Sequence, residues 1–120
     1  MNPYLGGDSV EPFLRHEGKG VILLCRTSNP GGDDVQYTHI ARRIAEDWSR
    51  MGECGLVVGA TYPAEVGVVR SIVGDLRLLV PGIGAQGGDV EATVRLGLTV
   101  SPISTGARGA PILFLIPRAA

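Results

Sequence analysis

The chain has 120 residues, about one domain or less, and 44% of them are hydrophobic. Its formal net charge is −1, which argues against a role on nucleic acid or on a membrane surface, where a basic excess is expected. No apolar run approaches the ~20 residues of a membrane span. The N-terminus has no basic stretch followed by a hydrophobic one, so no secretory signal is expected. We therefore expect a globular domain, located in the cytoplasm.

The two cysteines and two histidines show no spacing of a catalytic or metal site. Cys25 and Cys54 each lie beside an apolar, strand-like run. A disulfide between them is possible, but we favour reduced, buried thiols. His16 and His39 are isolated and are interpreted as surface or structurally satisfied residues. No metal site is predicted.

In chain order, segments of helical periodicity alternate with apolar runs that suit buried strands. The first helix is expected at 10–16, with Pro12 in its first turn. The next elements are a strand at 21–25, a helix capped by Asp33 or Asp34 and ended by Gly52, a strand at 55–60 and a helix from Pro63 to Gly74. A strand at 76–80, a helix from Asp89 to Gly97 and a strand beginning at 98–100 complete the series.

The helix that ends at Gly52 has the clearest apolar stripe. Its members recur at helical spacing and predict one core-facing side: they are Val35, Tyr37, Ile40, Ala41, Ile44, Trp48 and Met51.

Alternating strands and helices predict an α/β fold with a parallel sheet and right-handed crossovers. Either a doubly wound sheet or part of a (βα)₈ barrel satisfies the pattern. In both, functional loops lie at the carboxyl ends of the strands. Residues 102–120 fit poorly and form an atypical tail, in which the apolar run 112–116 is expected to be a strand packed against exposed core.

The strongest functional signal is the glycine-rich segment after the third strand. Gly82, Gly84, Gly87 and Gly88 leave backbone N–H groups free to approach an anion, beside the N-terminus of a helix. Gln86 is the one long polar side chain there. The segment predicts a phosphate site, although a tight turn without a ligand remains the alternative. It matches neither a dinucleotide fingerprint nor a Walker loop.

Two further residues are candidates for ligand binding. Ser28 follows the first strand and could read the polar edge of a heterocycle; the alternative is an ordinary capped turn. Arg108 follows the fourth strand and could clamp the same phosphate in a bidentate way, or it is a solvated surface arginine.

Four motifs together resemble orotidine 5′-phosphate decarboxylase in its bacterial long form. Pro-Gly-Ile-Gly-Ala-Gln-Gly-Gly-Asp at 81–89 resembles that family's phosphate loop after strand seven. Residues 2–13 resemble the segment after strand four, 25–31 resemble strand five and its loop, and 57–63 resemble strand six. The motifs occur in the family's order, over residues 1 to about 101.

The resemblance implies part of a (βα)₈ barrel, roughly strands 5–8 with their helices, as a single partial domain over 1–120. The implied reaction converts orotidine 5′-monophosphate to UMP and CO₂ without a metal or cofactor. By resemblance, Ser28 would hydrogen-bond the pyrimidine and Gln86 the 5′-phosphate. The backbone of Gly82 and Gly84 would lie close to that phosphate, with Arg108 as the nearest match to the family's phosphate arginine. The full-length family suggests a homo-oligomer, a dimer.

The sequence departs from the family in its reacting residues. The family's Asp-x-Lys-x-x-Asp array follows strand three, whereas this chain begins near the end of strand four. Its single lysine, Lys19, precedes strand five, at the opposite face. We therefore expect no catalytic residue here and no turnover by the chain alone. A different phosphate-binding barrel and a non-catalytic half-barrel that binds phosphate or a partner remain alternatives.

Overall fold

The computed structural model describes residues 1–27, 29–33, 36–81, 91, 98–103 and 112–117. The helices are α1 (Gly7–Leu14), α2 (Tyr37–Glu46) and α3 (Pro63–Val73), with short 3₁₀ turns η1 (Pro3–Leu5), η2 (Pro30–Asp33) and η3 (Trp48–Arg50). The strands are β1 (Gly20–Arg26), β2 (Glu53–Val58), β3 (Arg77–Val80), β4 (Leu98–Ile103) and β5 (Ile112–Pro117).

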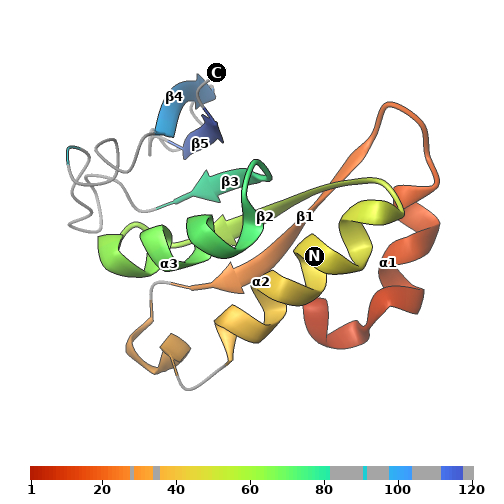
Figure 1. Ribbon diagram of the computed structural model, residues 1–120, viewed down its shortest axis with the longest axis horizontal. Helices are drawn as coiled ribbons and strands as arrows, with labels where there is room; N and C mark the ends of the chain where they lie inside the picture. Colours follow the sequence, from red (N-terminus) through yellow and green to blue (C-terminus); the bar gives the residue numbers. More distant parts are fainter. Residues whose placement is uncertain (28, 34–35, 82–90, 92–97, 104–111, 118–120) are drawn as a thin grey trace.

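The strands form one sheet in the order β1-β2-β3-β5-β4 (Figure 1). β1, β2 and β3 are parallel, and the register aligns Leu23, Leu56 and Leu78 in one row. α2 and α3 lie side by side along these strands. This arrangement confirms the predicted α/β fold with a parallel sheet, in which helices connect the successive parallel strands.

The far edge of the sheet differs from the expected order. The apolar run 112–116 is a strand, as predicted, but it pairs antiparallel with β3 and separates β3 from β4. β4 begins at Leu98, within the predicted start. The backbone of β5 supplies partners to the β3 edge through the pairs Leu78–Leu115 and Val80–Leu113. An unpaired edge would leave a row of N–H and C=O groups without strand partners.

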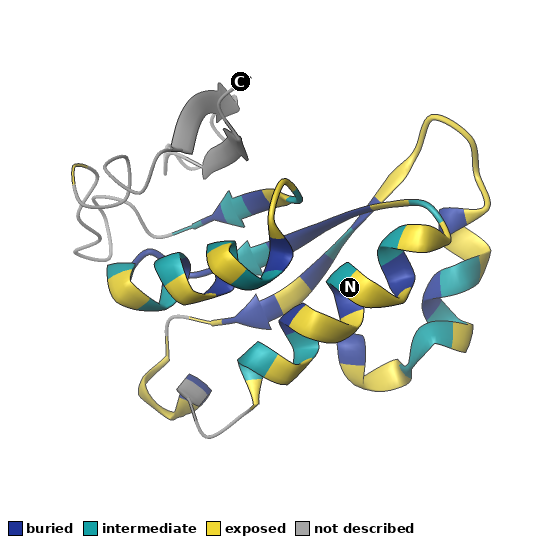
Figure 2. Ribbon diagram, in the orientation of Figure 1, coloured by how far each residue is buried: buried dark blue, intermediate teal, exposed yellow. Residues whose placement is uncertain are grey.

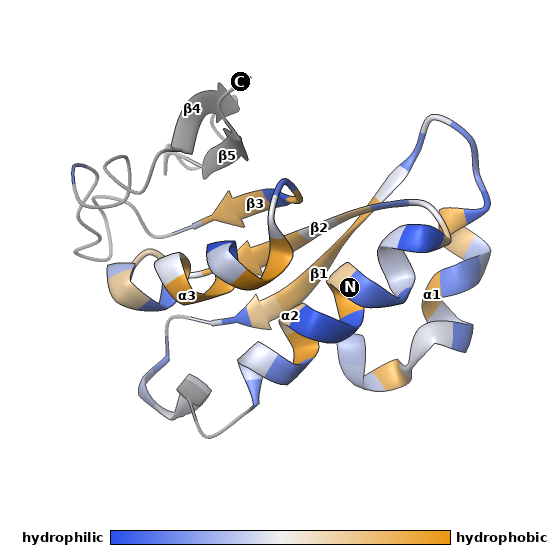
Figure 3. Ribbon diagram, in the orientation of Figure 1, coloured by the Kyte–Doolittle hydropathy of each residue, from blue (hydrophilic) through white to orange (hydrophobic). Residues whose placement is uncertain are grey.

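The core lies between the parallel strands and the helices. Leu23, Leu56 and Leu78 are fully buried, as are Ile44 on α2 and Val66 on α3. Figure 2 shows β1, β2 and β3 largely buried, with the helices buried on one side only. Figure 3 shows these three strands as hydrophobic, beside helices of mixed hydropathy. Burying one apolar stripe of each helix is the main stabilising contribution in such a layered fold.

The start of α1 and the caps of α2 were predicted wrongly. α1 begins at Gly7, so Pro12 lies inside the helix and not in its first turn. α2 begins at Tyr37 with Gln36 at the N-cap; Asp33 belongs to η2, and Asp34 lies outside the described residues. The prediction for α2 failed because residues 30–33 form a separate 3₁₀ turn before the helix begins.

The end of α2 also differs, because the helix stops at Glu46 and the chain continues through η3. Trp48 remains buried, but Met51 is 37% exposed and leaves the predicted stripe. Gly52 has another reason to be glycine: a Cβ there would come within 2.5 Å of the Leu14 carbonyl oxygen. By contrast, α3 agrees with the prediction, with Pro63 in its first turn and Gly74 at its C-cap with φ of 57°.

Adjacent valines on α3 offer a matched test of this packing. Val69 is fully buried and Val68 is 43% exposed. We expect Val69→Ala to lower the free energy of unfolding by about 2 kcal/mol, because it removes buried methyl groups and leaves a cavity. Val68→Ala should change it by less than about 0.5 kcal/mol. Urea unfolding of both variants measures the difference, and equal losses would contradict the assigned faces.

Candidate functional site at the carboxyl ends of the strands

Backbone hydrogen bonds join the carboxyl ends of the three parallel strands. Gly59 N–H donates to the Arg26 carbonyl at 2.7 Å, and Ala60 N–H donates to the Pro81 carbonyl at 3.0 Å. Figure 1 shows all three strands ending on the same side of the molecule. The loop after β1 and the segment after β3 therefore both start at the carboxyl end of the sheet, where parallel α/β folds place their ligands.

The residues predicted to bind a ligand lie outside the described residues: Ser28, Gly82, Gly84, Gln86 and Arg108. The structure describes the neighbours from which two of these segments start. Thr27 and Asn29 flank Ser28 at the end of β1, and Pro81 precedes Gly82 at the end of β3. The roles of the five residues stay predictions.

Arg26, which sequence reasoning missed, is the central polar group at this edge. Its side chain is 2% exposed although it is charged. Its Nε donates to Glu65 Oε2 at 2.6 Å, and Nη2 donates to Glu65 Oε1 at 3.4 Å. Glu65 lies in the first turn of α3, so this ion pair joins the end of β1 to the helix that follows β2.

The other guanidinium nitrogen holds the loop after β1. Nη1 of Arg26 donates to the carbonyl oxygens of Thr27 and Asn29, the latter at 3.2 Å. Thr27 Oγ1 also hydrogen-bonds the Asn29 side-chain oxygen. The guanidinium carbon lies 4.8 Å from the centre of the Tyr62 ring, within the range of a cation–π contact.

Gly32 gives the guanidinium its space. A Cβ at position 32 would overlap Arg26 Nη1 and approach the Thr27 carbonyl oxygen to 3.1 Å. The only signal of this arrangement in the sequence is an arginine that ends an apolar strand, with a glutamate in the first turn of a later helix. Neither residue type indicates the pairing without the strand register.

A cavity of about 190 Å³ lies beside the end of β1, lined in part by Asn2, Tyr4, Thr27 and Gly32. The N-terminal segment reaches it along the edge of β1. The Met1 amino group donates to the Ile22 carbonyl at 2.7 Å, and Leu24 N–H donates to the Met1 carbonyl at 2.9 Å. A second cavity, of about 230 Å³, lies near the amino ends of β1 and β2 and so is remote from the candidate site.

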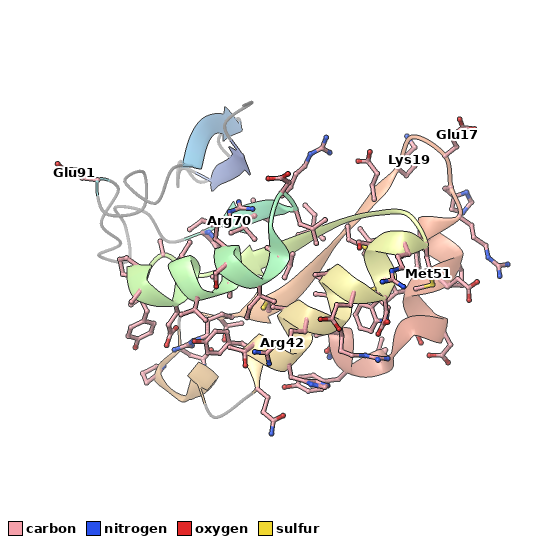
Figure 4. All side chains as sticks on the ribbon, in the orientation of Figure 1. Glu17, Lys19, Arg42, Met51, Arg70 and Glu91 are labelled. Carbon is pink, nitrogen blue, oxygen red and sulfur yellow. The ribbon has the colours of Figure 1, made fainter. Side chains whose placement is uncertain are left out.

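The lysine lies away from the candidate site, and neither histidine is buried. Lys19 is exposed in the turn before β1, at the opposite end of the strand (Figure 4), in agreement with the prediction. His16 and His39 are exposed. In the described part of the chain, no three His, Cys, Asp or Glu side chains are grouped so as to hold a metal ion. Its helices are also too short or too polar to cross a bilayer.

Both cysteines are free and buried, as favoured from the sequence. The Cys25 thiol donates to the Tyr37 carbonyl at 3.3 Å. Burial raises the pKa of Cys25 to about 12 and also raises the pKa of Cys54. A protonated, buried thiol is a poor nucleophile, so neither residue is a candidate for covalent catalysis.

Comparison with known proteins identifies the family. Residues 1–100 match the model of the orotidine 5′-phosphate decarboxylase / HUMPS family. The orotidine 5′-phosphate decarboxylase of Azoarcus sp. (strain BH72) is 59% identical over 110 residues, which cover 84% of this chain and 41% of that protein. The enzyme of the same name from Leptothrix cholodnii is 48% identical over 132 residues, which cover 99% of this chain and 46% of that protein.

Solved structures agree with this assignment. The Leishmania donovani UMP synthase has a TM-score of 0.75 and 44% identity, covering 81% of this chain and 24% of that one. The Leishmania donovani OMP decarboxylase has a TM-score of 0.71 and 40% identity, covering 81% of this chain and 40% of that one. The chain therefore spans less than half the length of these relatives, and its fold is a partial (βα)₈ barrel. It belongs to the orotidine 5′-phosphate decarboxylase / HUMPS family.

Proposed function

We propose that the chain carries the pyrimidine- and phosphate-binding part of an orotidine 5′-phosphate decarboxylase, which converts orotidine 5′-monophosphate to UMP and CO₂ in de novo pyrimidine biosynthesis. The family assignment supports the reaction class. The observation that carries the binding role is the hydrogen bonding between the carboxyl ends of the three parallel strands. The bonds from Gly59 to Arg26 and from Ala60 to Pro81 join the strand ends that precede the two predicted binding segments to the end of β2, the strand between them.

In this proposal Ser28 hydrogen-bonds the pyrimidine, and Gln86 hydrogen-bonds the 5′-phosphate together with the backbone of Gly82 and Gly84. Arg108 is the proposed bidentate partner of the same phosphate. Support for Ser28 comes from its described neighbours, since Thr27 and Asn29 lie at the carboxyl end of β1. The sequence pattern supports the glycine-rich segment, because bare N–H groups before a helix favour an anion.

The chemistry needs a positive group near the departing carboxylate, to stabilise the carbanion and to supply its proton. The single lysine of this chain, Lys19, lies at the amino end of β1, away from the proposed ligand. We therefore assign this chain a binding role and no catalytic residue.

A decarboxylation assay on the purified 120-residue chain tests this assignment. We expect no turnover of orotidine 5′-monophosphate above the uncatalysed rate. The reaction is monitored by the loss of the substrate's absorbance. Folding of the sample is verified by urea unfolding. Enzyme-like turnover would contradict the assignment and require a catalytic group within these residues.

Calorimetry with UMP and uridine tests the phosphate site. We expect Gln86→Ala to weaken UMP binding about 10-fold to 100-fold, the loss of one hydrogen bond to a charged group. Its affinity for uridine, which has no phosphate, should stay unchanged. Ser28→Ala serves as the matched variant and should lower the affinity for both UMP and uridine. Equal UMP affinities for wild type and Gln86→Ala would contradict the proposed contact between Gln86 and the phosphate.

We also propose that the chain forms a homo-oligomer, a dimer, and that it acts in the cytoplasm. Support for association comes from large exposed hydrophobic residues near the N-terminus: Tyr4 is 68% exposed, Leu5 62% and Phe13 54%. Free cysteines agree with a reducing compartment.

Light scattering at several protein concentrations tests the dimer. We expect a dimer mass for the wild-type chain and a monomer mass for the double variant Leu5→Glu/Phe13→Glu. Val68→Glu, on an exposed position of α3, is the control and should remain dimeric. A monomeric wild-type chain would overturn the proposal.

A further inference from the structure

We infer that Arg26 is a positioning residue that sets the conformation of the loop around Ser28 and so prepares it to bind the pyrimidine. The ligand part of this inference depends on the proposed function. The part of the inference that concerns how Arg26 holds Thr27 and Asn29 depends only on contacts of the described residues. Arg26 acts through Thr27 and Asn29 and does not touch the ligand.

The two hydrogen bonds that Arg26 donates to the loop share one donor nitrogen. One nitrogen, Nη1, donates to the carbonyl of Thr27 and to that of Asn29, the residues on either side of Ser28. Both carbonyls are thus held by the same nitrogen, so the positions of Thr27 and Asn29 are coupled. Five or six residues rich in turn formers otherwise have many accessible conformations, and ordering them on binding would weaken affinity.

The guanidinium also binds a second element, the helix α3. Glu65 on α3 accepts from Nε and Nη2, and the Tyr62 ring packs against the guanidinium. All three nitrogens therefore have protein partners. Through Arg26, the position of the loop after β1 is fixed relative to α3, a helix of 11 residues, and not only relative to its own neighbours in the chain.

Arginine can hold both sets of partners because of the geometry of its side chain. A planar guanidinium serves a carboxylate on one side and two carbonyls on the other, whereas a lysine ammonium is a point charge with no fixed fork. The side chain is 2% exposed, so it has no surface from which to reach a bound nucleotide. A buried charge with complete pairing is consistent with a positioning role.

The test compares Arg26→Lys with Gly32→Ala in the full 120-residue chain. Arg26→Lys keeps the charge but loses the fork. Gly32→Ala keeps the arginine but places a methyl group in the space of Nη1. The matched control is Arg43→Lys, in an exposed ion pair with Asp47 at 2.6 Å. Urea unfolding shows that each variant folds.

Two measurements separate positioning from general stability. Amide hydrogen exchange by NMR reports the order of residues 27–32, and calorimetry reports affinity for UMP and for ribose 5-phosphate. We expect both variants to speed exchange at residue 32, whose N–H donates to the Asn29 carbonyl at 2.9 Å, at least about tenfold relative to its intrinsic rate. We expect both to weaken UMP binding about tenfold, because the ordering cost then falls on binding. Affinity for ribose 5-phosphate should stay within about twofold, because that ligand has no base to contact Ser28. Arg43→Lys should change neither.

Native exchange rates and native UMP affinity in both variants would overturn the inference. Faster exchange with unchanged UMP affinity would also overturn it, because the loop order would then not matter to the base. If the wild-type chain binds neither UMP nor ribose 5-phosphate, the proposed function fails and the ligand part of the inference fails with it. The exchange rates still decide whether Arg26 holds the loop. If Arg26→Lys does not fold, Gly32→Ala decides both questions.

Discussion

The buried guanidinium of Arg26 is the constraint on which the candidate site at the carboxyl ends of the strands depends. It ends a strand whose other core side chains are apolar, and its partners come from three places: the adjacent loop, Glu65 on α3, and Tyr62 before that helix. A charge with so little access to water requires all its donors to be satisfied. The loop after β1, the turn at Gly32 and the start of α3 must therefore adopt mutually compatible positions.

The rest of the fold follows from a row of leucines and the helices that cover it. Leu23, Leu56 and Leu78 are aligned by the parallel register and are fully buried. The parallel ladder also brings the carboxyl ends of the strands together, through the bonds of Gly59 and Ala60. The same packing that stabilises the sheet thus places the candidate site, as in other α/β folds whose ligands bind at this end of the strands.

Local patterns in the sequence predicted the existence of the helices and strands better than the residues at which they begin and end. α3 was predicted from Pro63 to Gly74 because a proline tolerated in the first turn and a glycine at the C-cap are local signals. Pro12 and Met51 were placed wrongly because the start of α1 and the break after α2 depend on packing with other elements. Ser28, Gly82, Gly84, Gln86 and Arg108 were predicted from motifs. The structure describes the strand ends beside Ser28 and Gly82, but not these residues themselves.

By itself, the sequence determined the alternation of strands and helices, the family and the motif residues, because periodicity and short motifs are local properties of the chain. Only the tertiary structure decided that β5 occupies the edge of β3, that Arg26 is buried, and that it pairs with Glu65, 39 positions away. Such pairings depend on register and on which surfaces meet. A charged residue at the end of an apolar run has the same local sequence whether it reaches water or an internal partner.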